Sequence, residues 1–189
     1  MLHIVYGGSA SGKSSYAESF AMSLQGEGRL LYIATMYPYK WNTTEIDPET
    51  MQRIERHRAM RADKGFDTVE CYRHVEHIVA KRQDVLLLEC MSNLLANEMY
   101  LEPDGNAGSD MAETMSPVSN KIVQALIDLS TRVQELVIVT NDVFSDGGSL
   151  TYDESTREYV KNLAEINCAL AREAATVTEV VCGLSLIHI

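Results

Sequence analysis

The sequence is short of basic residues and has no long apolar run. Its 16 Lys and Arg residues stand against 27 Asp and Glu, which gives a formal net charge of −11 over 189 residues. Because neutralising nucleic-acid phosphates needs clustered Lys and Arg, we expect no nucleic acid as a general partner. Neither a basic-plus-apolar leader nor an apolar stretch of about 18 residues is present. We therefore expect neither export nor membrane insertion, and predict a cytoplasmic protein.

Closely spaced cysteine pairs are also missing. The four cysteines, Cys71, Cys90, Cys168 and Cys182, are far apart and never form a CxxC pair. We interpret them as reduced, small apolar fillers, with metal ligation as the weaker alternative. No internal repeat and no linker-like stretch divides the chain, whose 189 residues suit one substantial core. We therefore predict a single domain over residues 1–189.

Short apolar runs alternate with amphipathic segments along the chain. The runs are rich in Val, Ile and Leu, which is typical of strands that are buried on both faces. We predict strands at Leu2–Tyr6, Leu30–Ala34, Val85–Leu88, Leu136–Thr140 and Val177–Val181. We predict helices at Ser14–Leu24, Pro48–Asp63, Arg73–Lys81, Pro117–Val133 and Asp153–Ala175. This alternation indicates an α/β protein with a mostly parallel sheet and helices on both faces.

Three segments between these elements are long enough to be functional loops, namely Thr35–Asp47, Glu102–Ser116 and Asn141–Tyr152. The first and third follow predicted strands. Because ligands of open α/β sheets gather beyond the carboxyl ends of the strands, we expect these two loops to overhang the binding site. The apolar tail Leu184–Ile189 is compatible with a last strand, and no further prediction rests on it.

The most informative segment is Gly7–Ser14, whose sequence GGSASGKS fits the phosphate-binding pattern G-x-x-x-x-G-K-[ST]. In such a loop, backbone N–H groups and the following helix N-terminus surround the phosphates. Lys13 would reach the β- and γ-phosphates, and the Ser14 hydroxyl would ligate Mg²⁺. A mere Gly/Ser-rich turn does not account for the strand before this segment and the helix after it. We therefore predict binding of a nucleoside triphosphate by Gly7, Gly8, Ser9, Ala10, Ser11, Gly12, Lys13 and Ser14.

A second unusual segment is Arg53–Lys64, in which five of twelve residues are basic within a strongly acidic chain. Such a patch suits a polyphosphate or a negatively charged transition state. His57 lies in its middle, where an imidazole could act as nucleophile or base. The alternative is a solvated helix face held by pairs three and four residues apart.

Acidic residues follow two of the predicted strands. Glu89 ends the run Val85–Leu88, the expected place for a group that contacts Mg²⁺ directly or through water. Glu89 could equally contact the base or sugar, or be an acid favoured by a helix N-terminus. Asp142 follows another strand, where it could orient an acceptor hydroxyl or a metal, or cap a turn.

Together these segments resemble the bifunctional adenosylcobinamide kinase / adenosylcobinamide-phosphate guanylyltransferase family of cobalamin biosynthesis. The resemblance covers nearly the whole chain in the family's order. The segments that carry it are Gly7–Ser14, Tyr32–Thr35, Arg53–Arg58, Glu70–Cys71, Leu87–Cys90, Val139–Val143 and Val180–Gly183. It implies a P-loop NTPase of RecA-like fold, and a homo-oligomer that family precedent makes a trimer.

The resemblance also implies two reactions. ATP or GTP first phosphorylates the hydroxyl on the aminopropanol arm of adenosylcobinamide, and GTP then transfers GMP to adenosylcobinamide-phosphate through a guanylylated histidine. The family's nucleophile, in an R-I-x-x-H-[KR] segment, falls on His57, with Lys13 as the second catalytic residue. Further nucleotide contacts are implied at Ala34, Thr35, Met36, Arg58, Ala59, Met60, Arg61, Glu70 and Glu89. The expected Mg²⁺ ligands are Ser14 and Glu89.

Two departures from the family affect the acceptor side. Arg56 precedes His57 where some relatives have a His pair, and the stretch Asp146–Gly148 replaces a common G-x-G-I-V-P sequence. Asn167, by contrast, matches a later family asparagine. Two other functions therefore stay open at this point. One is a P-loop kinase of another small alcohol without the guanylyl step, and the other is a non-catalytic, nucleotide-dependent switch.

Overall fold

The computed structural model describes residues 1–101, 116–143 and 152–188. Most of the predicted loops Glu102–Ser116 and Asn141–Tyr152, including Asp146–Gly148, lies outside the described residues. Among the residues that are described, no helix is both long enough and apolar enough to cross a membrane.

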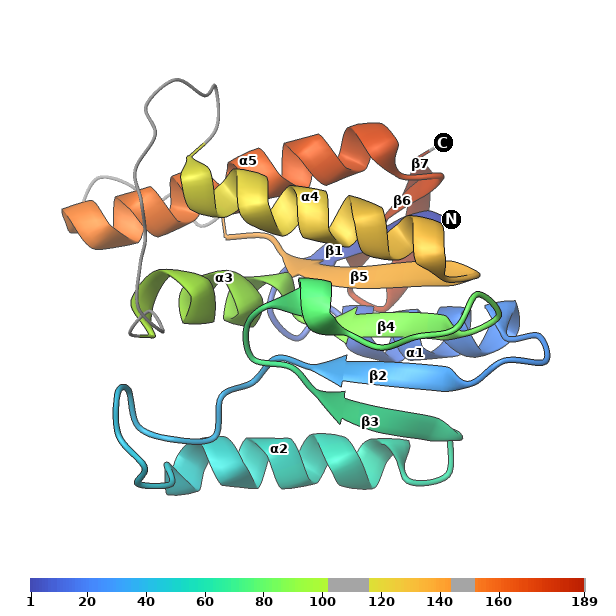
Figure 1. The fold of residues 1–189 in the computed structure, drawn as a ribbon, viewed down its shortest axis with the longest axis horizontal. Coiled ribbons are helices and arrows are strands. Elements are labelled where there is room, and N and C mark those ends of the chain that lie inside the picture. The colour runs from blue at the N-terminus through green and yellow to red at the C-terminus, as the bar shows by residue number, and fades with distance from the viewer. Residues whose placement is uncertain (102–115, 144–151, 189) are drawn as a thin grey trace.

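The described strands form one seven-stranded sheet in the order β3-β2-β4-β5-β1-β6-β7 (Figure 1). Neighbouring strands are parallel except for the antiparallel pair β6 and β7. The strands are β1 (Leu2–Gly7), β2 (Leu30–Ala34), β3 (Phe66–Glu70), β4 (Val85–Glu89), β5 (Glu135–Asn141), β6 (Thr176–Val181) and β7 (Leu184–His188). The strand that precedes the phosphate loop is therefore separated from β4 by β5.

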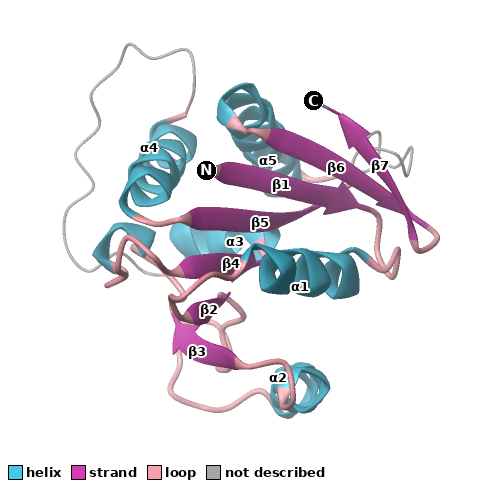
Figure 2. Ribbon diagram, turned by 90° about the vertical axis from the view of Figure 1, so that its right-hand side faces the viewer, coloured by secondary structure: helices cyan, strands magenta, loops and turns pink. Residues whose placement is uncertain are grey.

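Helices cover both faces of this sheet, and Figure 2 shows α4 and α1 on opposite sides of it. The helices are α1 (Lys13–Leu24), α2 (Pro48–Arg61), α3 (Met91–Tyr100), α4 (Pro117–Arg132) and α5 (Glu154–Glu173), with a 3-10 turn at η1 (Val75–His77). Alternate residues of β4 lie on opposite faces of the sheet. Leu86 and Leu88 pack with α3, α4 and α5, whereas Val85 and Leu87 pack with α1. The predicted α/β fold, with a mostly parallel sheet between helices, is confirmed.

The predicted strands all form, each within one residue of its expected ends. β1, β2, β4 and β5 are apolar runs buried from both sides, whereas β6 is only partly buried. The helix predicted at Arg73–Lys81 is wrong, since only the short turn η1 forms there. One turn is enough to bury its two core residues, Val75 and Ile78. His74, just before the turn, has a positive φ of 58°, which is not helical. Helix α3 was not predicted, although Met91, Leu94 and Leu95 have helical spacing and are buried.

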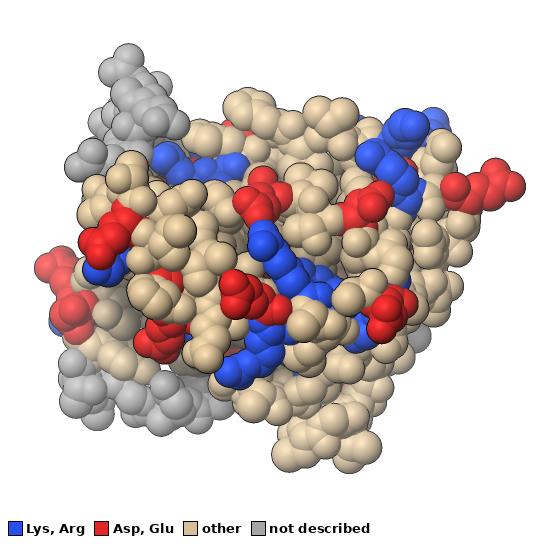
Figure 3. Space-filling view, turned by 90° about the horizontal axis from the view of Figure 1, so that it is seen from below, with Lys and Arg blue, Asp and Glu red and all other residues tan. Residues whose placement is uncertain are grey.

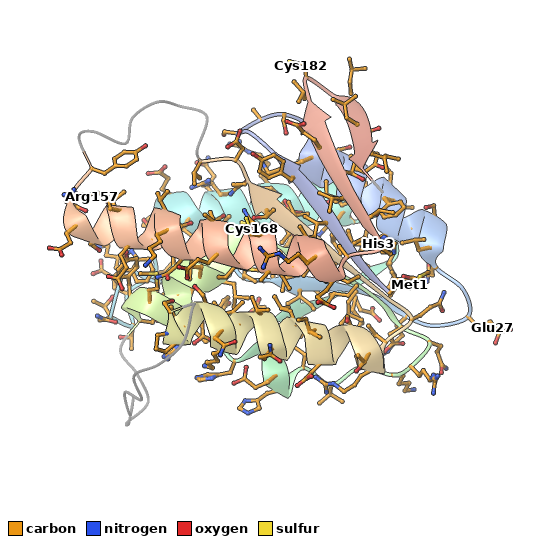
Figure 4. The ribbon with its side chains drawn as sticks, turned by 90° about the horizontal axis from the view of Figure 1, so that it is seen from above. Met1, His3, Glu27, Arg157, Cys168 and Cys182 are labelled. Atoms are coloured by element: carbon orange, nitrogen blue, oxygen red, sulfur yellow. The ribbon has the colours of Figure 1, made fainter. Side chains whose placement is uncertain are left out.

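Two of the four cysteines do not fill the core. Cys168 on α5 and Cys182 in the turn between β6 and β7 are exposed and lie well apart (Figure 4), so the filler interpretation is wrong for both. Cys71 and Cys90 are partly buried. Burial raises the pKa of Cys71 to about 11 and also raises the pKa of Cys90, so both stay protonated thiols near neutral pH.

Strand register brings distant segments to one edge of the sheet. Gly7 pairs with Asn141, and Glu89 pairs with both Ala34 and Val139. The parallel strands β1, β2, β4 and β5 thus end together, and the phosphate loop, the segment after β2 and the start of α3 follow from that edge. Buried Asn97 of α3 fixes part of this arrangement by donating to the carbonyl oxygens of Thr35 and Tyr72, both at 2.8 Å.

Candidate active site

A cavity of about 380 Å³ lies at the carboxyl edge of the sheet, between the phosphate loop and α2. It brings together side chains that the sequence analysis selected from separate segments. The predicted residues that line it are Ser9, Lys13, Ser14, Ala34, Met36, His57, Arg58, Arg61, Glu70 and Glu89.

The loop Gly7–Ser14 has the tight geometry that phosphate binding requires. Gly12 has a φ of 92°, a left-handed conformation that favours glycine, and α1 begins at the next residue. A Cβ on Gly7 would lie 2.5 Å from the carbonyl oxygen of Val180, so the loop also needs glycine there to pass β6. Lys13 is only 8% exposed, and its ammonium donates to the carbonyl of Gly8 at 3.0 Å. The cation is therefore held over the loop that it is expected to serve.

Glu89 and Ser14 meet on the floor of the cavity. Burial raises the pKa of Glu89 above its ordinary value, although a hydrogen bond from Ser14 and the nearby imidazole of His57 act in the opposite direction. Within the described residues, the buried Oε2 of Glu89 has no hydrogen-bond partner. A hydroxyl and a carboxylate oxygen are ligands that Mg²⁺ accepts. The donor set and its unpaired oxygen thus fit the predicted magnesium site.

Helix α2 turns one face toward the phosphate loop. His57 and Arg58 follow Ile54 by three and four residues, Arg61 follows them by four and three, and all four residues line the cavity. Arg61 is only 6% exposed, and its guanidinium carbon lies 3.4 Å from the ring centroid of Tyr32. Its buried Nε and Nη1 have no partner among the residues that the structure describes. A buried cation with unpaired donors is costly, and an anionic ligand would relieve that cost.

The rim of the cavity carries an exposed ion pair. Arg58 of α2 pairs with Glu70 at the end of β3, and the Tyr72 hydroxyl donates to the same carboxylate at 2.9 Å. Burial, followed by the hydrogen bond to Glu70, raises the pKa of Tyr72 above its ordinary value. Seen from the side of α2, Lys and Arg side chains form a diagonal band with Asp and Glu on both sides (Figure 3). The basic residues of this region are therefore partly paired rather than a uniformly positive surface.

Several predicted nucleotide contacts do not line the cavity. Thr35 is fully buried; its hydroxyl donates to the carbonyl of Cys90 at 2.9 Å and accepts from the Cys90 N–H at 2.7 Å. It braces the chain after β4 and is not among the residues that line the cavity. Ala59 and Met60 are exposed on another face of α2, Met60 by 57%. From the loop, Gly7, Gly8, Ala10, Ser11 and Gly12 are also absent from the lining.

Other lining residues went unassigned in the sequence analysis. They are Tyr32, Arg53, Ile54, Tyr72, Cys90, Ser92, Asn93, Val139, Asn141 and Val143. Asp142 also lines the cavity, and the sequence analysis considered it for orienting an acceptor hydroxyl or a metal, or for capping a turn. Ser92 and Asn93 belong to α3, which was not predicted, so no sequence pattern indicated that they would line the cavity. Asn141 directly follows a predicted strand. Its side-chain amide donates to the Ser92 hydroxyl at 2.5 Å.

Asp142 lies between the loop and the cavity. Its N–H donates to the carbonyl of Gly7 at 2.9 Å. Burial, then the charge and hydrogen bond of Asp142, raises the pKa of Tyr6 to about 12. The Tyr6 hydroxyl therefore stays protonated and holds this carboxylate beside the loop.

Comparison with known proteins identifies close parallels over the whole chain. The family model described as cobinamide kinase / cobinamide phosphate guanyltransferase matches residues 3–187. The chain is 29% identical over 193 residues to the bifunctional adenosylcobalamin biosynthesis protein CobU of Escherichia coli (strain K12), covering 98% of each. It is 29% identical over 194 residues to the protein of the same name from Salmonella typhimurium (strain LT2), with the same coverage. Among solved structures, the flagellar accessory protein FlaH from Methanocaldococcus jannaschii is similar with a TM-score of 0.45 and 13% identity, over 100% of this chain and 76% of that one.

Proposed function

The chain belongs to the cobinamide kinase / cobinamide phosphate guanyltransferase family of cobalamin biosynthesis, and we propose that it performs both reactions in one cavity with His57 as the guanylylated residue. The observation that carries this proposal is that His57 lines the same cavity as Lys13 and Ser14 of the phosphate loop. A triphosphate held by that loop would extend toward α2, where the imidazole lies.

In the kinase step, the hydroxyl oxygen of adenosylcobinamide attacks the γ-phosphorus of ATP or GTP. The bond to the β–γ bridging oxygen breaks, and the nucleoside diphosphate leaves. Lys13 and Arg61, both buried cations of the cavity, would neutralise charge on the phosphoryl oxygens. Asp142 lines the same cavity beside Gly7, which suits a role in orienting the acceptor hydroxyl.

In the guanylyl step, a ring nitrogen of His57 attacks the α-phosphorus of GTP and the bond to the α–β bridging oxygen breaks, releasing pyrophosphate. A phosphate oxygen of adenosylcobinamide-phosphate then attacks the same phosphorus, and the nitrogen–phosphorus bond breaks. The product is adenosylcobinamide-GDP, and His57 is regenerated. Splitting one transfer into two in this way is the usual advantage of a covalent intermediate.

Ser14 and Glu89 are the residues that we propose to hold Mg²⁺, on the strength of their oxygen donors and the unpaired Glu89 Oε2. When bound, the ion would neutralise charge on the nucleotide phosphates. Glu89 must be ionised for this role; burial raises its pKa and opposes this, whereas the hydrogen bond from Ser14 and a bound cation would both favour the ionised form.

We further propose a single catalytic domain over residues 1–189 that works as a cytoplasmic homotrimer. All described strands share one sheet, which supports the single domain. The family resemblance supports the trimer and the compartment. Light scattering during size-exclusion chromatography measures the mass of the assembly, and a monomeric or dimeric mass would contradict the trimer.

Covalent labelling tests the central assignment. Wild-type protein incubated with α-labelled GTP is expected to keep label after denaturation, and His57→Ala is expected to keep none. His77→Ala is the matched control, because His77 is exposed and is not among the residues that line the cavity. Full labelling of His57→Ala would show that another residue is the nucleophile.

Lys13→Ala tests whether the two steps share one nucleotide site. Because Lys13 is the phosphate-loop cation of the shared cavity, both phosphorylation and labelling should be lost in this variant. Guanylyl transfer that survives in Lys13→Ala would require a second nucleotide site.

A further inference from the structure

Aromatic side chains gather on the surface next to the cavity. We call Tyr37, Tyr39, Trp41, Tyr72 and Tyr100 the aromatic shelf. The ring centroids are 5.4 Å apart from Tyr72 to Tyr37, 6.4 Å from Tyr37 to Trp41, and 6.3 Å from Trp41 to Tyr100. Trp41 is 52% exposed, and Tyr39 and Tyr100 are each 38% exposed. The shelf therefore presents a large, contiguous aromatic surface to solvent.

A second, open cavity of about 470 Å³ lies against one end of the shelf. It is lined by Trp41, Ala96, Tyr100, Thr156 and Tyr159, from the segment after β2, from α3 and from the start of α5. In Figure 1 these elements meet beyond the carboxyl ends of the strands, on the side of the active site. The second cavity is thus formed by described residues on the functional edge of the sheet.

Two connections join the shelf to the active-site cavity. Tyr72 belongs to the shelf and also lines the active-site cavity. Tyr159 lines the second cavity and donates to the carbonyl of Ser92, which lines the first. The two cavities have no lining residue in common, but these two contacts make them neighbouring parts of one surface.

The shelf is preformed rather than left loose. In the segment after β2, the N–H of Lys40 donates to the carbonyl of Glu45 at 2.9 Å, and the N–H of Asp47 donates to the carbonyl of Pro38 at 3.0 Å. Tyr39 also pairs with Ile46 as an isolated bridge. An ordered segment that holds an indole ring half in water is typical of a binding surface, because exposed apolar area is otherwise avoided.

Building on the proposed function, we propose that the aromatic shelf binds the corrin macrocycle while the hydroxyl-bearing arm enters the active-site cavity. The active-site cavity, at about 380 Å³, must hold the nucleotide as well as the reacting end of the acceptor. A corrin ring with its amide side chains is far larger than that arm, so the ring has to stay outside. The contiguous surface outside the cavity is the shelf, whose aromatic faces suit the apolar atoms of the ring.

Trp41 supplies a direct measurement, because it is the only tryptophan in the chain. Titration with cobinamide, in the absence of nucleotide, is expected to quench Trp41 fluorescence to saturation, since the coloured corrinoid would lie against the indole. Ala96→Phe keeps this reporter and fills the second cavity, so it should weaken cobinamide binding about tenfold or more. Fluorescence that does not respond to saturating cobinamide would overturn the proposal.

Trp41→Ala gives an independent kinetic test. The KM for cobinamide in the kinase assay should rise about tenfold or more, while labelling of His57 by α-labelled GTP stays at the wild-type level. Val79→Ala is the control, because Val79 is 85% exposed in the segment before β4 and lines neither cavity. An unchanged KM in Trp41→Ala would overturn the proposal.

Two further outcomes separate the competing explanations. If Trp41→Ala changes the mass of the assembly without changing cobinamide affinity, the shelf is a contact between subunits and the proposal is wrong. Loss of His57 labelling in the wild type would refute the proposed function, whereas the fluorescence titration would still decide whether the shelf binds cobinamide.

Discussion

Arg61 offers the sharpest test of how this site is built, through the substitution Arg61→Met. The guanidinium is 6% exposed, lies over the Tyr32 ring, and has two buried nitrogens without a partner among the described residues. Methionine keeps an apolar stem of similar length that can still contact the ring. The substitution therefore removes the charge and its unpaired donors while preserving most of the packing.

The structure predicts opposite effects on stability and on ligand binding. Each unpaired buried donor costs about 1–3 kcal/mol, and the contact with the ring returns about 2 kcal/mol. The two donors together cost about 2–6 kcal/mol. Arg61→Met should therefore leave the free energy of unfolding unchanged or raise it by up to about 4 kcal/mol, which is at most about 8–16 °C in Tm for a chain of this size. Losing a charged hydrogen bond to phosphate costs about 1.5–3 kcal/mol, so nucleotide should bind about 10- to 150-fold more weakly.

Thermal unfolding without nucleotide and calorimetric titration with GTP measure the two effects. Arg56→Met is the matched control, since Arg56 is exposed on the same helix and is not among the cavity-lining residues. It should change neither quantity appreciably. The reasoning is refuted if Arg61→Met loses about 2 kcal/mol or more of stability and binds GTP as tightly as the wild type, because Arg61 would then be a structural cation.

Three further substitutions test contacts that hold the sheet together, two of them at the amino ends of β2 and β4. Gly28→Ala places a Cβ 1.8 Å from a backbone carbonyl oxygen and should lower the free energy of unfolding, measured by chemical denaturation, by about 3 kcal/mol. In the control Gly26→Ala the new Cβ meets only a flexible side chain, so the free energy of unfolding should change by about 0.5 kcal/mol or less. Equal effects of the two substitutions would contradict this geometry. Burial acts to raise the pKa of Asp84, but hydrogen bonds from Arg29 and from backbone N–H groups outweigh it and hold the pKa below its ordinary value. The ionised form of Asp84 therefore stabilises the fold at neutral pH, and this contribution is lost as the pH falls below about 4. Asp84→Asn should lower the free energy of unfolding by about 1–3 kcal/mol at pH 7 and by progressively less in acid. A difference in unfolding free energy that does not change with pH would refute this reasoning. Thr35→Val removes two buried hydrogen bonds and should lower the unfolding free energy by about 1–3 kcal/mol, and a loss of GTP affinity with unchanged stability would instead show that Thr35 contacts the nucleotide.

The parts of the fold that could be predicted are those set by local pattern. The apolar runs that became β1, β2, β4 and β5 are buried on both faces, and a strand of that kind is recognisable without knowing its neighbours. β6 is only partly buried, and its run of Val and Thr residues was enough to predict it. Helix α3 escaped prediction because it is short and follows β4 after a single residue, so its apolar spacing merged with the strand. The helix expected at Arg73–Lys81 failed because only two of its apolar residues are buried.

In the candidate site, too, the features set by local sequence could be predicted and those set by long-range contacts could not. The phosphate loop was predictable because its glycines, lysine and serine are contiguous and lie between a strand and a helix. Thr35 is predicted to contact the nucleotide, but it does not line the cavity and its hydroxyl bonds to the backbone of Cys90, a long-range contact that the sequence does not reveal. Tyr32 was missed because it enters the site through its contact with Arg61 of α2, which is equally long-range.

The amino-acid sequence by itself determined the phosphate loop, the strands β1, β2, β4, β5 and β6, and the basic segment around His57, because each consists of adjacent or regularly spaced residues. Only the tertiary structure decided that His57 and Lys13 line one cavity, that Arg61 is buried without a partner among the described residues, and that Trp41 continues an aromatic surface from that cavity. These placements depend on the strand order β2-β4-β5-β1 and on how α2 packs against its edge, which are long-range contacts that local patterns do not encode.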